Sequence, residues 1–199
     1  VVKAQKIAPT VAEKWEIIMI DDGSSDKTQD IAQKLAQKDS HLSVISHHPN
    51  RGYGAALREG LIHSKYKYIV FNDGDNQFDF SEVGKFIERI YVADVVIGYR
   101  KKRRDNAVRH VLMNLLKVWD FIFFGFYFRD IDCGFKMFTK DAVDKIMPLR
   151  SEGAMITTEI LAKAKLKKLK IIYNRTTTNL SLIIIFNNQM KQTNLLINS

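Results

Sequence analysis

The feature of the sequence that most constrains its fold is a repeated alternation of short apolar runs with segments of helical spacing. Residues 16–20 (EIIMI) and 68–71 (YIVF) are apolar runs that end in polar, glycine-containing residues. Runs of this length flanked by turn residues are typical of buried strands. Similar strands are expected at residues 42–45 and 94–97, and helices over the first dozen residues and at residues 26–38, 54–63 and 83–90. This order predicts an α/β fold with a mostly parallel sheet flanked by helices.

Composition limits the classes of protein that fit this pattern. The chain has 199 residues, of which 46% are hydrophobic and 27% are charged, so it can bury one sizeable core and is not a disordered acidic chain. Its one cysteine, Cys133, excludes an intramolecular disulfide framework and a cysteine-only zinc site. No run of 18 uncharged apolar residues is present, so no simple membrane span is visible.

The net charge of +9 is distributed unevenly along the chain. The part that ends at Glu159 holds 24 basic and 22 acidic residues, whereas seven basic residues and no acidic residue follow it. A basic protein can bind nucleic acid or an anionic membrane surface. Because the main body is almost neutral, we do not expect a nucleic-acid partner.

Three of the expected strands end in loops with chemically reactive side chains. These loops read DDGSSD at residues 21–26, NDGD at 72–75 and GYRKKRR at 98–104. In open parallel sheets ligands bind beyond the carboxyl ends of the strands, so the three loops should meet at one edge. Asp73 and Asp75 have the oxygen chemistry that Mg²⁺ or Mn²⁺ prefers, often shared with substrate phosphates. A polar turn is the alternative for this pair alone, and a turn with a capped helix is the alternative for residues 21–26.

A further glycine-containing loop, NRGYGAAL at residues 50–57, leads into a helix. It lacks the lysine of a Walker loop and the glycine spacing of a dinucleotide fingerprint. The helix N-terminus could favour an anion, and close packing is an equally good explanation for the glycines.

Together, five motifs in this order resemble the inverting family 2 glycosyltransferases, which have a GT-A, Rossmann-like fold. The motifs are DDGSSDKT, NRGYGAALREG, FNDGDNQF, GYR and RDIDCGFKMF. The similarity covers roughly residues 14–170 and is greatest to the polyprenyl-phosphate or dolichyl-phosphate sugar synthases. It implies transfer of a sugar from a UDP- or GDP-sugar to a polyprenyl or dolichyl phosphate, assisted by Mg²⁺ or Mn²⁺.

The resemblance also implies roles for individual residues. The metal would be held by Asp73 and Asp75, and the catalytic residues would be Asp75, Asp130 and Arg100. Residues expected to contact substrate, with the basic run around residue 109 included for the acceptor, are Asp21, Asp22, Asn50, Gly52, Gly54, Asp73, Gln77, Arg109 and Lys136. Within the basic run, at least half of the residues are expected to be solvated only.

The acceptor decides whether the reaction needs a base. A lipid phosphate is already anionic, so cations that position it matter more than a proton acceptor. A hydroxyl acceptor, as on a glycan, requires a general base. The candidates for that role are Asp130, Asp132 and Glu159.

Residues 111–128 (VLMNLLKVWDFIFFGFYF) form a very apolar segment next to the basic run. Its polar residues are spaced by three and fall within about 120° of a helix. Together with the family resemblance, this pattern favours a helix in the membrane interface. The resemblance implies a protein that is peripheral on the cytoplasmic face of the membrane. A core helix or a dimer contact is the alternative, and the sequence does not fix the oligomeric state.

The two ends of the chain depart from the family pattern. The first strand of the family would precede Val1 and is apparently missing, which predicts a fragment. After residue 170 an Asn-, Ile- and Thr-rich stretch replaces the expected acceptor loop. We therefore predict an incomplete glycosyltransferase domain over residues 1–172 and a divergent tail over 173–199 whose composition allows disorder.

Other classes remain open from the sequence alone. A nucleotidyltransferase also binds a nucleotide and a carboxylate-held metal on an α/β sheet. A degenerate, inactive nucleotide-binding fragment would show no metal-dependent turnover. A nucleic-acid-binding module would show steep salt dependence, and the nearly neutral body disfavours it.

Overall fold

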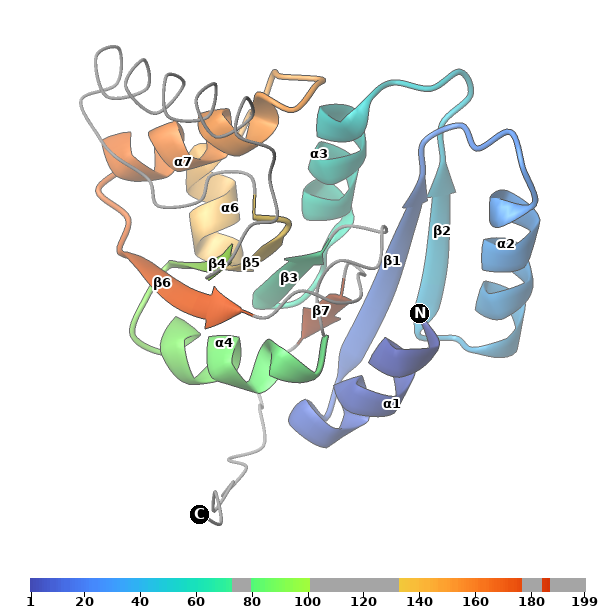
Figure 1. The fold of residues 1–199 in the computed structure, drawn as a ribbon, viewed down its shortest axis with the longest axis horizontal. Helices are drawn as coiled ribbons and strands as arrows, with labels where there is room; N and C mark the ends of the chain where they lie inside the picture. Colours follow the sequence, from blue (N-terminus) through green and yellow to red (C-terminus); the bar gives the residue numbers. More distant parts are fainter. Residues whose placement is uncertain (73–79, 101–132, 177–183, 187–199) are drawn as a thin grey trace.

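The computed structural model describes residues 1–72, 80–100, 133–176 and 184–186 (Figure 1). Every element expected up to residue 97 is present, with ends that differ by one or two residues in most cases. In chain order the elements are α1 (Val2–Val11), β1 (Trp15–Asp21), α2 (Thr28–Lys38), β2 (Leu42–Ser46), α3 (Tyr53–His63), β3 (Tyr68–Asn72), η1 (Phe80–Glu82), α4 (Val83–Ile90), β4 (Val95–Arg100), β5 (Phe135–Thr139), α6 (Lys140–Ile146), α7 (Ile156–Leu166), β6 (Ile171–Thr176) and β7 (Ile184–Phe186).

The strands form one sheet of seven, in the order β2-β1-β7-β3-β5-β4-β6. The expectation of a mostly parallel sheet is wrong for the pairing of neighbours, because the sheet is mixed. Only β1 with β2 and β4 with β6 pair in parallel, whereas β5 and β7 pair antiparallel with both of their neighbours. The two antiparallel strands come from residues 135–139 and 184–186, where the alternation of strands and helices had predicted no strand.

The directions of the strands still bring the expected loops to one edge. Because β7 is antiparallel to both β1 and β3, these two strands point the same way. Likewise, β5 is antiparallel to both β3 and β4, so β3 and β4 also point the same way. The carboxyl ends of β1, β2, β3, β4 and β6 therefore lie at a common edge of the sheet, which is where β5 begins.

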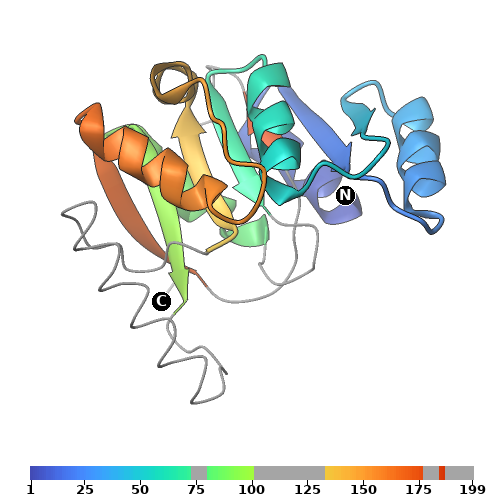
Figure 2. The ribbon, with the colours of Figure 1, turned by 90° about the horizontal axis from the view of Figure 1, so that it is seen from above.

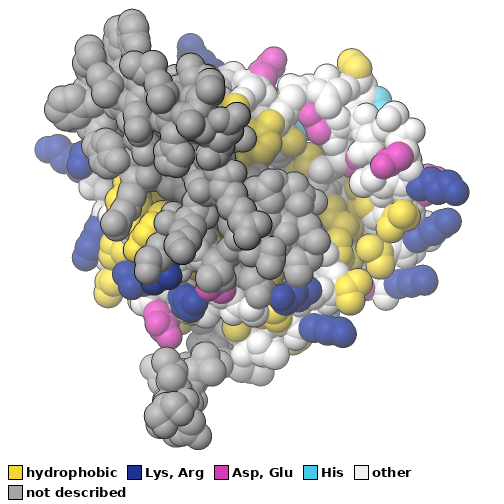
Figure 3. All heavy atoms as spheres, in the orientation of Figure 1, with side chains coloured by type: hydrophobic (Ala, Val, Ile, Leu, Met, Phe, Trp, Pro, Cys, Tyr) yellow, Lys and Arg dark blue, Asp and Glu magenta, His cyan; other side chains and the backbone are white. Residues whose placement is uncertain are grey.

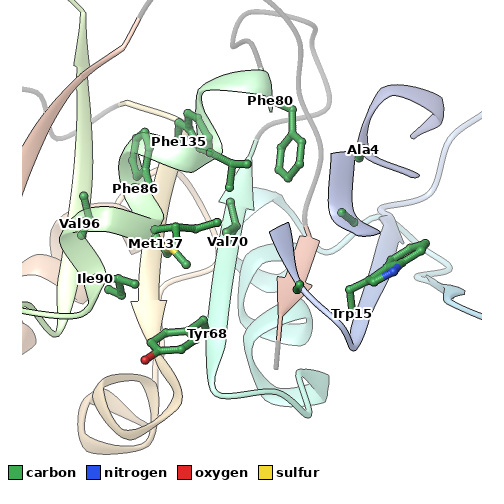
Figure 4. Close-up of a cluster of buried hydrophobic side chains, with 14 of the residues drawn as sticks. Ala4, Trp15, Tyr68, Val70, Phe80, Phe86, Ile90, Val96, Phe135 and Met137 are labelled. Carbon is green, nitrogen blue, oxygen red and sulfur yellow. The ribbon is translucent and has the colours of Figure 1, made fainter. Parts of the chain in front are cut away.

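Alternate residues of the strands face two separate hydrophobic layers. Val70, Val96 and Met137 face α1, η1 and α4, whereas Ile69 and Ile97 face α3, α6 and α7. Figures 1 and 2 show these helices on opposite sides of the sheet. Figure 4 shows the first layer, in which the Phe86 and Phe135 rings lie 4.1 Å apart between centroids. Burial of both faces explains the nearly uninterrupted apolar runs of the central strands.

The last strands involve residues that the composition assigned to a divergent tail. Strand β6 runs from Ile171 to Thr176 and so crosses the expected boundary at residue 172. Strand β7 lies between β1 and β3 and pairs Ile185 with Glu16 and with Ile69. Residues 177–183 and 187–199 of the expected tail lie outside the described residues.

Among the described helices, none has the length and hydropathy needed to cross a membrane. The apolar segment 111–128, for which we predicted a helix in the membrane interface, lies outside the described residues.

Candidate functional site at the carboxyl edge of the sheet

The end of β1 presents two adjacent carboxylates with different surroundings. Asp21 is 5% exposed, and its Oδ1 accepts a long hydrogen bond of 3.4 Å from the backbone N–H of Ser24. Its Oδ2 is buried and has no hydrogen-bond partner in the described part of the chain. Since buried polar atoms are almost always paired, this oxygen is available to a ligand that carries a donor.

Asp22 instead organises the loop that follows β2. Its Oδ1 accepts the backbone N–H of Arg51 at 2.9 Å, and its Oδ2 accepts that of Gly52 at 2.7 Å. The Asn50 side chain donates to the backbone carbonyl of Asp22 at 2.5 Å. Burial raises the pKa of the Asp22 carboxyl, but hydrogen bonds from Arg51, His47 and Gly52 outweigh it and leave this pKa below its usual range.

His47 is a component of the site that sequence reasoning missed. It follows β2 and is 6% exposed, with Nδ1 2.7 Å from Asp22 Oδ1. Its backbone N–H donates to the carbonyl of Asp21 at 2.9 Å. The ring Nε2 is buried without a hydrogen-bond partner among the described residues. A histidine after a strand gives no local signal of such a contact, because its partner lies 25 positions earlier in the chain.

The glycines of the second loop are required by close packing of backbones. A Cβ on Gly54 would lie 2.5 Å from the carbonyl oxygen of Ser151, and one on Gly52 would lie 2.7 Å from that of Glu152. The Gly54 N–H donates to the Glu152 carbonyl at 2.6 Å. Gly52 also has a φ of +92°, which favours glycine. Contact with a nucleotide stays a prediction for Asn50, Gly52 and Gly54.

Glu159 holds the segment against which these glycines pack. This residue lies in the first turn of α7, and its carboxylate accepts the backbone N–H groups of Arg150 and Ser151 at 2.8–3.0 Å. Lys163 adds a contact of 2.7 Å. Burial raises the pKa of Glu159, but the hydrogen bonds from Lys163 and the two N–H donors outweigh this effect and lower the pKa to about 2. A carboxylate with four donor contacts and this pKa is a poor general base, so the structure does not favour that candidate role.

The remaining described residues of the site lie at the ends of β3, β4 and β5. Asn72 pairs with Phe135, so the residue before Asp73 lies beside the start of β5. Lys136 is fully buried and donates to the carbonyl of Cys133, and its contact with substrate stays a prediction. Arg100 is the last residue of β4. The predicted residues outside the described part are Asp73, Asp75, Gln77, Arg109, Asp130 and Asp132.

The close approach of β4 to the start of β5 explains the glycine two residues before the predicted Arg100. A Cβ on Gly98 would lie 2.8 Å from Cys133 Sγ and 2.9 Å from the carbonyl of Phe135. A side chain at this position would therefore push β4 away from the segment that leads into β5. The GYR motif thus has a packing requirement in addition to its predicted role near phosphate.

The described residues contain no cluster of three or more acidic, histidine or cysteine side chains that would hold a metal ion. The predicted pair, Asp73 and Asp75, follows β3 directly in the sequence, and Asn72 at the end of β3 lies at the same edge as Asp21. Carboxylates form the donor set that Mg²⁺ and Mn²⁺ prefer, so the residue types fit the implied metal.

The family assignment rests on sequence comparison over most of this architecture. The family described as "Glycosyl transferase family 2" matches residues 2–146. The chain belongs to glycosyl transferase family 2. This match includes β1 to β5 and the loops that meet at the carboxyl edge, and it ends where α6 ends.

Curated relatives include several proteins named dolichyl-phosphate beta-glucosyltransferase. The protein from Saccharomyces cerevisiae is 33% identical over 79% of this chain and 55% of its own length. The human protein is 29% identical over 85% of this chain and 56% of its own length. The protein from Dictyostelium discoideum is 34% identical over 76% of this chain and 51% of its own length. The chain thus spans about half the length of these relatives.

Solved structures of low sequence identity share the fold. Glucosyl-3-phosphoglycerate synthase from Mycobacterium tuberculosis, in complex with Mn²⁺, UDP-glucose and phosphoglyceric acid, matches with a TM-score of 0.57 and 16% identity. The match covers 79% of this chain and 57% of that one. The mannosyltransferase PcManGT from Pyrobaculum calidifontis, in complex with GDP-Man and Mn²⁺, matches with a TM-score of 0.53 and 13% identity. This match covers 81% of this chain and 46% of that one. The structural neighbours are GT-A fold glycosyltransferases.

Proposed function

We propose that this chain is the catalytic part of an inverting glycosyltransferase that moves a sugar from a nucleotide-diphosphate sugar to a polyprenyl or dolichyl phosphate. The observation that carries the acceptor is the similarity to proteins named dolichyl-phosphate beta-glucosyltransferase over 76–85% of the chain. These names favour glucose as the sugar. The chain would then act at the cytoplasmic face of a membrane.

The donor half of the proposal is supported by the arrangement at the end of β1. Asp21 has a buried carboxylate oxygen without a partner in the described part, which suits an N–H or O–H donor of a nucleoside. Asp22 positions residues 50–52 beside it through two backbone N–H groups. We therefore assign Asp21 to contact with the nucleoside and Asp22 to positioning of the loop.

The transfer step needs stabilisation of a leaving diphosphate and positioning of an anionic nucleophile. An oxygen of the acceptor phosphate attacks the anomeric carbon as the bond from that carbon to the nucleoside diphosphate breaks, with inversion. A Mg²⁺ or Mn²⁺ ion held by Asp73 and Asp75 would neutralise charge on the diphosphate. Arg100, Arg109 and Lys136 would supply cations for the phosphates, and Asp130 would act on the acceptor. No strong general base is required for a phosphate nucleophile.

The proposal is tested by a transfer assay with radiolabelled UDP-glucose and dolichyl phosphate, with GDP-mannose as a second donor. Label should move into the organic phase only when the lipid phosphate and Mg²⁺ or Mn²⁺ are both present, and Asp75→Ala should abolish this transfer. Labelling of a glycan acceptor without labelling of the lipid would contradict the proposed acceptor. A protein that folds and binds donor but transfers to neither would contradict the proposed activity.

A further inference from the structure

A groove distinct from the carboxyl-edge site lies between α6 and α7. Its walls are the end of α6, residues 147–150 and one face of α7, and its volume is about 400 Å³. Figure 2 shows α7 running across the molecule on the side away from α2. Most of this groove lies beyond residues 2–146, which match the family. We call it the basic groove, after the cations that line it: Lys145, Arg150, Lys163 and Lys167.

The charge of the basic groove is poorly compensated. Among its described lining residues only Glu159 is acidic, and its carboxylate is already engaged by Lys163 and by backbone N–H groups. Lys145, Arg150 and Lys167 are exposed, and their side chains form no ion pair with another described residue. Three cations therefore face solvent around the groove.

Apolar side chains lie among these cations. The lining includes Met147, Pro148 and Leu166, and Leu166 is 77% exposed. On α7, residues 159, 163 and 166 are separated by three or four positions, so they share one face of the helix, and Lys167 caps its C-terminus. An exposed leucine flanked by Lys165 and Lys167 is an amphipathic surface for which no described element supplies a partner.

We propose that the basic groove docks on an anionic lipid surface, with lipid headgroups at its cations and Leu166 in the boundary with the acyl chains. Cations near such a surface each contribute measurably to attraction, and a buried apolar side chain adds to it. A single-stranded nucleic acid would require aromatic platforms for its bases, and none of the described residues that line the groove is aromatic. Charge complementarity combined with an exposed aliphatic side chain thus selects the membrane as occupant.

The position of the groove relates it to the carboxyl-edge site. Residues 150–152 join the groove to the loop at Gly52 and Gly54, and Glu159 fixes their backbone. Docking through the groove would therefore hold the site loop close to the lipid surface. Binding to this surface requires neither donor nor acceptor.

The test is flotation of the full chain with phosphatidylcholine vesicles that contain or lack phosphatidylserine. The groove variant K145Q/K167Q loses two charges. The control variant K34Q/K38Q loses two on α2, which lies across the molecule and whose lysines are exposed and form no ion pair with a described acidic residue. In Figure 3 basic side chains project on the right, where Figure 1 places α2. Circular dichroism melts verify that both variants fold.

The groove variant should bind phosphatidylserine vesicles about thirty-fold more weakly than the unmodified chain, and the control should stay within about three-fold. Leu166→Ser should weaken binding several-fold with charge unchanged. Equal loss in the two lysine variants, or failure of the unmodified chain to bind phosphatidylserine vesicles, would overturn the proposal. Because no donor is present, either result is independent of the transfer assay.

Discussion

Replacing Glu159 with glutamine removes the charge that holds the segment 150–152 in place. A charge-assisted hydrogen bond contributes about 1.5–3 kcal/mol, and glutamine keeps only one acceptor oxygen for the N–H groups of Arg150 and Ser151. The shift of the Glu159 pKa from 4.5 to about 2 gives an upper bound of about 3 kcal/mol, which solvent screening reduces. We therefore expect Glu159→Gln to lower the free energy of unfolding by about 2 kcal/mol.

This prediction has a pH dependence of known sign. The folded state lowers the pKa of Glu159, so its stabilising contribution is complete above pH 4.5 and decreases as the pH falls toward 2. Urea melts at pH 7 should thus show the full difference between the unmodified chain and Glu159→Gln, and melts at pH 3 should show a smaller one. At neutral pH the melting temperature should fall by about 4–8 °C.

Glu152→Gln is the matched control, because this glutamate lies in the same segment with an exposed side chain. We expect it to change the free energy of unfolding by less than about 0.5 kcal/mol. The account of Glu159 would be refuted if both variants lost the same stability. It would also be refuted if the difference for Glu159→Gln stayed constant between pH 7 and pH 3.

Two further substitutions test the packing and the loop of the site. Gly54→Ala should destabilise the fold by about 2–3 kcal/mol in urea melts, because its Cβ would meet two backbone groups of residues 151–152. Gly84→Ala is the control and should be neutral or stabilising, since a Cβ there would have no atom within 4 Å. Equal effects of the two substitutions would contradict this packing. Asp22→Asn should lower the free energy of unfolding by about 2 kcal/mol at pH 7. The loss should become smaller as the pH falls below 3.8, because the pKa of Asp22 is lowered in the folded state. An unchanged melt would contradict the role of Asp22 in positioning residues 50–52.

Local sequence patterns predicted the elements well but could not predict how the strands pair. Residues 16–20 and 68–71 are continuous apolar runs, and both form strands because both of their faces are covered. Nothing within those runs specifies that β7, from the far end of the chain, lies between them. The antiparallel β5 was likewise missed, since its sequence FKMFT had been interpreted only as part of a motif.

The site shows a similar division between residue identity and residue role. The family resemblance implied that Asp21, Asp22, Asn50, Gly52 and Gly54 contact the same substrate, and the structure brings their two loops together. It could not separate Asp21, whose Oδ2 has no partner among the described residues, from the fully engaged Asp22, because this difference depends on donors about 30 positions away. The packing of Gly52 and Gly54 on residues 151–152 is a long-range contact of the same kind.

The most direct measurement of the central claim, a metal-dependent nucleotide-sugar site at this edge, is a thermal-shift comparison of UDP-glucose and GDP-mannose with and without Mn²⁺. Ligand at 100 times its dissociation constant adds about 2.7 kcal/mol, which corresponds to about 5–11 °C for a domain of this size. The account predicts that one donor with Mn²⁺ gives this shift, and that Asp21→Asn and Asp75→Ala each abolish it. A cooperative melt that no donor shifts, or a shift that survives in both variants, would contradict it.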